Sequence, residues 1–201
     1  MKLYMKPGAC SLAPHIALRE AGLAFDLVKV DLATKKTEDG GDFLAVNPKG
    51  QVPTLAFDDG DVLTENAVIL QYIADQAPQA GLLPEGGSAA RYRVLEWLNF
   101  IATELHKGFS PLFRPTTPDA YKATVKETLA AKLAVLDRRL AGVPFLAGDR
   151  FTVADVYAFV VVCWAKPMGI ELSPWPNLAA YMGRLAERPA FQAARAAEGL
   201  A

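Results

Sequence analysis

The most reactive side chain in the sequence is a cysteine just ahead of a predicted helix. Cys10 follows the turn Pro7-Gly8-Ala9, and helical periodicity begins after Ser11. The unpaired N–H groups and the dipole of a helix start favour the thiolate form of a nearby cysteine. A buried structural thiol is the commoner fate of cysteine. Because this turn is not an apolar periodic position, a functional thiol is favoured here.

The helix after Cys10 has clear start and stop signals. Ser11 is its expected N-cap, and Pro14 then falls in the first turn, where a missing N–H is tolerated. Gly22 is the expected C-terminal stop. With Ala13 at the fourth position, the segment lacks the Cys-x-x-Cys pair of a disulfide exchanger. His15 is expected to be a structural or capping residue.

A second segment could bind an extended peptide-like ligand through its backbone. Asn47–Pro53 reads as a loop that leads into a strand, Thr54–Phe57, and a proline forces extended backbone on Val52. If Val52–Pro53 is cis, the N–H and C=O of Val52 could turn outward and pair with a ligand as an added strand would.

A third segment could bind a carboxylate. After the hairpin turn Asp58–Asp61 and a strand from Val62, the polar residues Thr64–Asn66 open an apolar-periodic helix, Ala67–Asp75. Free N–H groups and partial positive charge at a helix N-terminus suit a carboxylate. An ordinary loop, hairpin and helix remains the alternative interpretation.

Composition and charge narrow the class of protein. The chain has 201 residues, 52% apolar and 21% charged, and a net charge of -1, which is typical of a globular protein and gives no reason to expect nucleic acid or an acidic membrane as partner. No 18-residue apolar run and no signal peptide is expected. Two distant cysteines, Cys10 and Cys163, fit a reducing cytosol, so a cytoplasmic location is predicted.

The elements around these segments predict a mixed first domain over residues 1–77. Strands at Lys2–Met5 and Phe25–Val30, separated by the first helix, form a parallel βαβ unit. Asp31–Asp42 is expected to be a mobile surface segment, and Phe43–Val46 a short helix. A thiol on the first strand-to-helix turn that faces Val-Pro at the start of another strand is the thioredoxin arrangement with one cysteine.

A Pro/Gly-rich linker, residues 78–87, precedes an all-α domain, residues 88–201. The expected helices run from Ala89 to about Phe109 or Leu112, then over Asp119–Leu140, Val153–Ala165, about Trp175–Glu187, and Pro189–Glu198. Thr152 and Asp155 resemble a capping box, and the apolar helix after Thr152 is the expected centre of this domain, with Cys163 in its core.

One face of the long helix after Ser88 carries polar residues at spacings of four, three, four and three. They are Tyr92, Glu96, Asn99, Thr103 and His106. This spacing predicts a single polar stripe. A solvated surface is the expected state of Glu96, whereas Asn99 and His106 could line a cleft, with His106 and Lys107 supplying donors.

Five motifs in order resemble the bacterial beta class of cytosolic glutathione S-transferases. They are Pro7–Leu12, Asn47–Pro53, Glu96–Asn99, Glu104–Gly108 and Phe151–Asp155. The resemblance covers essentially the whole chain. It implies the glutathione transferase fold, in which an N-terminal thioredoxin-like domain is followed by an all-helical domain. It also implies a cytoplasmic homodimeric detoxification enzyme that conjugates glutathione, its co-substrate, to a small hydrophobic electrophile without a metal.

The resemblance also implies roles for individual residues. Cys10 would face the glutathione sulfur and could form a mixed disulfide with it, and Ser11 and His106 would donate hydrogen bonds nearby. The residues for the rest of the tripeptide would be Lys35, Gln51, Asn99 and Lys107 for the glycyl end or neighbouring backbone, Val52 with Pro53 for the cysteinyl backbone, and Glu65 and Asn66 for the γ-glutamyl group. Thr103 and Glu104 would lie near the dimer interface, where Glu104 could reach the ligand of the neighbouring subunit.

Two positions depart from the family pattern. Met5 stands where the family often has Tyr, and Asn66 replaces a small residue. The electrophile pocket is expected to be walled by apolar residues: Met5, Phe109, Leu112, Phe113 and Trp164. Two other functions stay open. One is thiol-disulfide reductase or peroxidase chemistry at Cys10, and the other is a non-catalytic binding or regulatory protein on the same fold.

Overall fold

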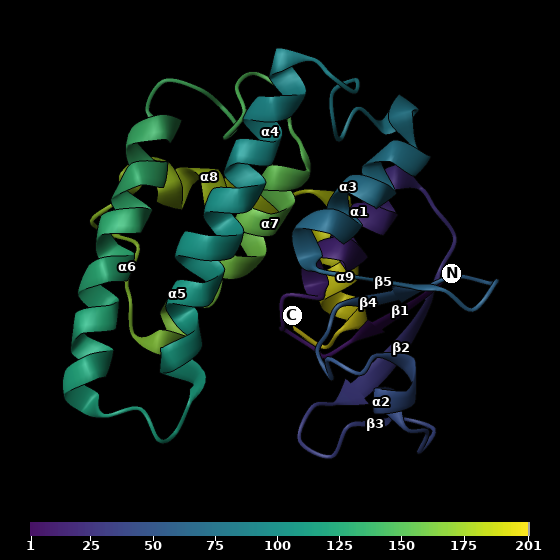
Figure 1. Ribbon diagram of the computed structural model, residues 1–201. Helices are drawn as coiled ribbons and strands as arrows, with labels where there is room; N and C mark the ends of the chain where they lie inside the picture. The colour runs from purple at the N-terminus through teal and green to yellow at the C-terminus, as the bar shows by residue number, and fades with distance from the viewer. Residues whose placement is uncertain (201) are drawn as a thin grey trace. The chain divides into compact units, whose positions relative to one another are not determined.

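A five-stranded sheet organises the N-terminal part of the computed structural model, which describes residues 1–200 (Figure 1). The strands lie in the order β3-β2-β1-β4-β5; β1 pairs in parallel with β2, and the other pairs are antiparallel. The elements are β1 (Lys2–Met5), α1 (Leu12–Ala21), β2 (Asp26–Asp31), β3 (Lys36–Thr37), α2 (Phe43–Val46), β4 (Thr54–Ala56), β5 (Val62–Thr64), α3 (Asn66–Gln76) and η1 (Pro78–Ala80).

Alternation along β1 explains how the sheet is covered on both faces. Leu3 and Met5 are buried, and α1 and α3 pack together on one side of the sheet. The ring of Tyr4 points the other way, 5.6 Å from that of Phe43 in α2, which lies across the sheet from α1 and α3 (Figure 1). The predicted parallel pairing of β1 with β2 and the predicted short helix at residues 43–46 are both confirmed.

The structure adds detail to two predictions for this region. Ser11 takes the predicted N-cap position of α1, but its hydroxyl makes no capping bond; it instead bonds the backbone N–H and C=O of Lys6, because the turn brings Lys6 next to it. Within the polar segment 31–42, two residues form the strand β3, which pairs with β2 and was not predicted; the mobility of the segment stays a prediction. Gly22 ends α1 in the left-handed conformation (φ 67°), as expected.

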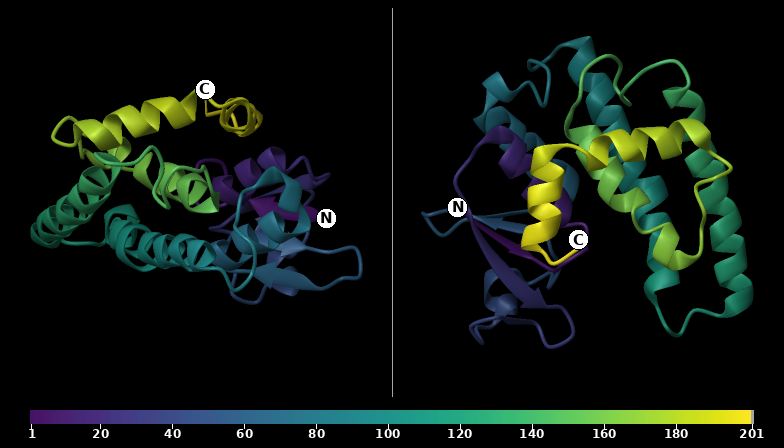
Figure 2. Two further views of the ribbon diagram at one scale, coloured as in Figure 1. Left: turned by 90° about the horizontal axis from the view of Figure 1, so that it is seen from above. Right: turned by 180° about the vertical axis from the view of Figure 1, so that it is seen from behind.

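The last helix of the chain packs with this sheet unit. The helix α9 (Pro189–Ala197) lies beside α1, as Figure 2 shows in yellow and purple. The compact unit is Met1–Leu82 together with the described part of Arg188–Ala201, and the second unit is Leu83–Glu187. The predicted domain limits, 1–77 and 88–201 with a linker at 78–87, stay predictions.

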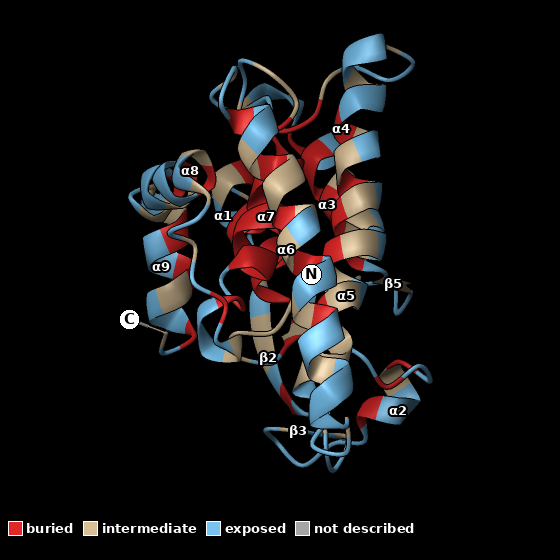
Figure 3. Ribbon diagram, turned by 90° about the vertical axis from the view of Figure 1, so that its left-hand side faces the viewer, coloured by how far each residue is buried: buried red, intermediate tan, exposed pale blue. Residues whose placement is uncertain are grey.

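The second unit is helical and is centred on α7. Its elements are α4 (Ala89–Phe100), the π-helix η2 (Ile101–His106), α5 (Lys107–Phe109), η3 (Ser110–Phe113), α6 (Asp119–Leu140), α7 (Val153–Val162), η4 (Lys166–Met168) and α8 (Pro176–Ala186). Every residue of α7 is buried, as its red ribbon in Figure 3 shows, and α4 and η2 pack against it. The capping box of Thr152 and Asp155 is confirmed.

Cys163 does not lie in this core. The helix ends at Val162 rather than at residue 165, and Cys163 takes the C-cap position, where it is exposed. Among residues 1–200, no helix combines the length and the apolar character that crossing a membrane requires.

Candidate functional site

Three segments that are distant in sequence meet around Cys10 in the first unit. The turn between β1 and α1 carries Cys10, whose half-buried Sγ lies 3.3 Å from the Val52 carbonyl oxygen and donates to it. On the other side, the amide nitrogen of Asn66, at the start of α3, donates to the Cys10 carbonyl oxygen at 2.9 Å. The predicted thiol, backbone and helix-start segments are thus brought together.

The loop that carries Val52 is braced from within. The buried side chain of Asn47 donates through Nδ2 to the Gln51 carbonyl oxygen and to the Thr54 hydroxyl, both at 2.9 Å. The Val52–Pro53 peptide bond is cis. Within residues 1–200, the N–H of Val52 makes no hydrogen bond, so the described part of the chain leaves this backbone donor unused.

The start of α3 combines free backbone donors with a strained residue. Glu65 takes the N-cap position with φ 71° and ψ 115°, an arrangement that is unfavourable for a residue with a side chain, and it makes no side-chain cap. Its exposed carboxylate is 3.2 Å from the Lys49 ammonium group. Asn66 is only 6% exposed, and the Val68 N–H donates to the Glu65 carbonyl oxygen, so the exposed polar side chain at this helix start is that of Glu65.

Lys35 is the second non-glycine residue with positive φ, at 58°. Its Nζ donates to the Gly50 carbonyl oxygen at 2.7 Å, directly before Gln51. This bond ties the β2–β3 turn to the loop of Val52, and it leaves the exposed side chain of Gln51 beside the same loop.

Residues from the end of the chain hold the Cys10 turn in place. Glu198 accepts from the Gly8 N–H at 3.0 Å and contacts Nδ1 of His15 at 2.8 Å, with both side chains fully buried. Arg19 donates through Nε to Nε2 of His15, so the ring proton sits on Nδ1 and points at Glu198. The structural role expected for His15 is confirmed. Glu198 and its partner Gly8 are 190 residues apart in the sequence.

In the second unit, His106 lies in an aromatic cluster. Its Nδ1 is 2.6 Å from the Tyr157 hydroxyl, and its ring packs edge-on against Trp164 at 5.0 Å. Trp164 also contacts Phe109 and Phe113 edge-on, at 5.9 and 5.2 Å. Three of the residues predicted for the electrophile pocket therefore form one cluster.

The prediction of a single polar stripe along residues 92–106 is wrong for its last member, His106. The π-helical turn η2 has more residues per turn than the α-helix, so His106, at the end of this turn, is rotated away from the stripe. Asn99 and Thr103 are exposed, whereas His106 turns toward Tyr157. Glu96 is exposed, as expected, and pairs with Arg93.

The other predicted residues are placed as follows. Glu104 forms an ion pair of 2.6 Å with Lys132 on α6, Thr103 bonds back to the Asn99 carbonyl, and Lys107 is exposed. Met5 is buried in β1 of the first unit, and Leu112 is half-buried in η3. Within residues 1–200, no group of His, Cys, Asp and Glu side chains is arranged to hold a metal.

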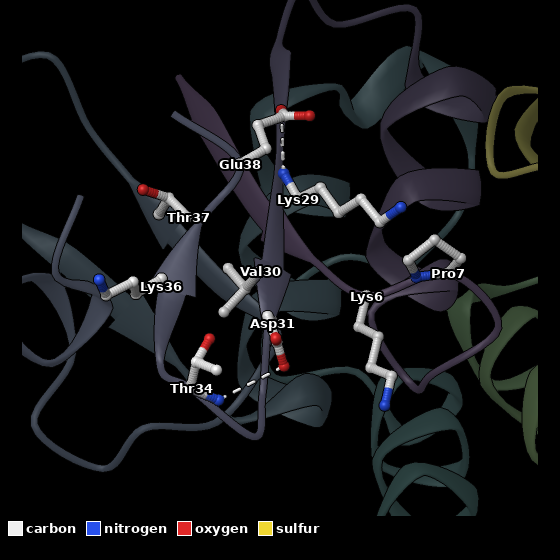
Figure 4. A pocket seen from close by; sticks show the side chains of 9 residues that line it. All are labelled: Lys6, Pro7, Lys29, Val30, Asp31, Thr34, Lys36, Thr37 and Glu38. Atoms are coloured by element: carbon white, nitrogen blue, oxygen red, sulfur yellow. Dashed lines mark hydrogen bonds between the residues drawn. The ribbon is translucent and has the colours of Figure 1, made fainter. Parts of the chain in front are cut away.

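A separate hollow of about 660 Å³ lies over β2 and β3 in the first unit (Figure 4). Lys6, Lys29 and Lys36 line it, but their ammonium groups point in three different directions. Both carboxylates there already accept backbone N–H groups: Asp31 from Ala33, and Glu38 from Lys29. These side chains do not converge on one anion.

Comparison with known proteins assigns the chain to a family. The glutathione S-transferase N-terminal domain model matches residues 8–76, and the C-terminal domain model matches residues 100–189. Glutathione S-transferase GstA of Escherichia coli O157:H7 is 54% identical over 200 residues, covering 100% of both chains. The chain belongs to the glutathione S-transferase family. The predicted enzyme class and fold are thereby confirmed.

Solved glutathione S-transferase structures share this fold closely. A bacterial beta class enzyme of Sphingomonas chungbukensis is 53% identical, with a TM-score of 0.97 and 100% of both chains covered. A sphingomonad glutathione S-transferase complexed with glutathione is 55% identical, with the same score and coverage. The beta class resemblance read from five motifs is therefore confirmed.

Sequence reasoning missed three residues that support the site in this glutathione S-transferase. Asn47 is the first residue of the Asn47–Pro53 motif, and its position before Pro48 could have suggested a turn residue that braces the loop. Tyr157 lies in a nearly all-apolar helix, where its hydroxyl was the only sign of a polar partner. Glu198 gave no local signal, because its partners come from the other end of the chain.

Proposed function

We propose that this protein binds glutathione in its first unit and transfers the glutathione thiolate to a small hydrophobic electrophile. The observation that supports this most directly is the meeting of Cys10, Val52 and the start of α3. A thiol, a free backbone N–H and a helix N-terminus match, in order, the sulfur, the cysteinyl backbone and the γ-glutamyl carboxylate of an extended tripeptide. Glu65 would bind its ammonium group.

The remaining assignments come from family membership and are part of the proposal. Ser11 and His106 would stabilise the sulfur. Lys35, Gln51, Asn99 and Lys107 would serve the glycyl end, and Pro53 would shape the backbone next to Val52. Phe109, Leu112, Phe113, Trp164 and Met5 would meet the electrophile. We also propose a homodimer in the cytoplasm, with Thr103 and Glu104 near its interface.

The chemical step needs glutathione as the thiolate. Its thiol loses a proton to solvent, the sulfur attacks the electrophilic carbon, and the leaving group departs with the bonding pair. A free thiol has a pKa of about 8.5, so an environment that brings it near neutral raises the reactive fraction at pH 7. Holding both reactants together supplies the rest.

Two measurements test the proposal. Titration calorimetry with reduced glutathione should give heat of binding. The thiolate absorbance of the complex should then titrate below the range of free glutathione. No heat of mixing, or a glutathione titration unchanged by the protein, would remove the proposal and leave a binding or regulatory role on this fold.

A second candidate function rests on Cys10 itself. Because its thiol is half-buried but lies beside the proposed sulfur position, it could attack glutathionyl mixed disulfides. The Cys10→Ala variant separates the two activities. Loss of disulfide reduction with conjugation retained would assign Cys10 to reductase chemistry, and loss of both would place it in a shared step.

A further inference from the structure

The side chain of Asn66 makes a buried connection between α3 and the Cys10 turn. The residue is only 6% exposed, and its amide nitrogen donates to the Cys10 carbonyl oxygen at 2.9 Å, across 56 positions of sequence. No sequence pattern pointed to this contact, because asparagine at a helix start ordinarily faces its own helix as a cap.

The contact fixes the orientation of the amide. A carbonyl oxygen can only accept, so the NH2 of Asn66 must face Cys10 and its Oδ1 must face away. In residues 1–200, no donor lies within hydrogen-bond distance of this buried Oδ1. A buried acceptor without a partner lowers the stability of the folded state. The side chain of Asn66 therefore makes one favourable hydrogen bond and leaves one buried acceptor unpaired.

The hydrogen bond from Asn66 holds the backbone of Cys10. Its carbonyl oxygen also accepts from the Ala13 N–H at 3.1 Å, and its Sγ donates to the Val52 carbonyl at 3.3 Å. The Ala13 bond lies within the first turn of α1 and cannot relate that turn to α3. Asn66 is the side chain that ties the backbone of Cys10 to the start of α3.

We propose that Asn66 is a positioning residue for Cys10, held at the expense of stability. It sets the place of the Cys10 thiol relative to the N-terminus of α3. In the proposed function, these two points meet the sulfur and the γ-glutamyl head of one ligand. That this spacing serves to bind one ligand rests on the proposed function, but the positioning of Cys10 by Asn66 can be measured without glutathione.

The central variant is Asn66→Leu, which keeps the approximate shape and removes both polar atoms. It loses the bond to Cys10 and also the unpartnered Oδ1, so its denaturation midpoint should equal or exceed that of the unchanged protein. The matched control is Gln71→Leu, which removes a side-chain amide on the same helix whose nitrogen donates to the Ala67 carbonyl oxygen.

Two readouts follow Cys10 without any ligand. The first is the rate of alkylation by iodoacetamide across a pH series, resolved for each cysteine by peptide mass spectrometry, with the exposed Cys163 as internal reference. The second is amide hydrogen exchange over residues 6–13. Loss of one hydrogen bond should speed exchange at Ala13 by roughly 2- to 10-fold and shift the alkylation profile of Cys10 alone.

The outcomes separate positioning from ordinary structural support. Faster exchange and an altered Cys10 profile with an undiminished midpoint in Asn66→Leu, and neither change in Gln71→Leu, support the proposal. A lowered midpoint with unchanged Cys10 reactivity and exchange overturns it. If Asn66→Leu does not fold, Asn66→Ser carries the test, because its hydroxyl is too short to reach Cys10.

Only the last experiment uses glutathione. If the unchanged protein binds glutathione, Asn66→Leu should raise the KM for glutathione by a larger factor than it lowers kcat. If the unchanged protein gives no heat with glutathione, the proposed function fails, while the exchange and alkylation results still decide the role of Asn66.

Discussion

The backbone N–H of Gly8 donates a hydrogen bond of 3.0 Å to the carboxylate of Glu198, so a residue near the end of the chain fixes the turn that carries Cys10. The same carboxylate accepts from His15, whose other ring nitrogen accepts from Arg19. The approach to the thiol is therefore held by α1 and α9 together.

Glu198→Gln should weaken this arrangement. A glutamine has one acceptor oxygen and one NH2 group, so it cannot accept from both Gly8 and His15. We expect the free energy of unfolding to fall by about 2 kcal/mol, the cost of a buried donor left without its acceptor. Urea denaturation measures this, with the exposed Glu187→Gln as control. Equal losses in both variants would contradict the prediction.

Glu65 offers a test that separates strain from ligand binding. Its φ of 71° is strained, so Glu65→Gly should raise the free energy of unfolding by about 1 kcal/mol after the entropy loss of glycine. Glu65→Gln keeps the strain and removes the charge, so its stability should stay unchanged. Both should weaken glutathione binding about tenfold, by the loss of a charged hydrogen bond. Calorimetry that shows full affinity in either variant would remove Glu65 from the site.

Tyr157 and His106 should act as a pair. Tyr157→Phe keeps the ring contact but removes the hydroxyl 2.6 Å from Nδ1 of His106. We expect a loss of about 1 kcal/mol in stability and a lower kcat/KM for conjugation. In a double-mutant cycle with His106→Ala, the two effects should not add. Strict additivity of the two activity losses would show that the tyrosine acts independently of His106.

The buried carboxyl of Asp155 gives a prediction for pH. Burial raises the pKa of Asp155, although Leu146, Thr152 and Tyr181 donate hydrogen bonds to it. With its pKa raised in the folded state, its contribution to stability is full below the unfolded pKa of 3.8 and is lost as pH rises through the folded value.

The matched variant is Asp155→Asn, which cannot titrate. It should be less stable at every pH, because an NH2 group faces donors in the capping box. The difference between the unchanged protein and this variant should shrink as pH rises from 4 upward, as measured by urea denaturation at several pH values. A difference that grows with pH would mean that the folded state prefers the carboxylate.

Much of the first unit could be predicted because its signals are local. The proline after Val52, the Asp/Gly turn after Phe57 and the glycine at position 22 each impose a conformation on their own segment. The strand β3 was not predicted, because two residues are too few to show an alternation of apolar and polar side chains. Its pairing with β2 depends on tertiary contact.

The site was harder to predict where contacts join distant segments. The amide of Asn66 bonds Cys10 instead of its own helix, and Cys163 follows the end of α7, which lies at Val162, three residues before the predicted end. The π-helical turn before Lys107 changed the direction of His106, and helical spacing assumed at 3.6 residues per turn could not reveal it.

The placement of α9 beside α1 has a consequence for how the protein is made. During synthesis, the residues that form the sheet leave the ribosome long before Glu198 does, so until then the side of α1 that packs against α9 stays uncovered. A nascent chain halted after residue 187 should therefore expose His15 to solvent and bind chaperones, although every strand of its sheet is already outside the exit tunnel.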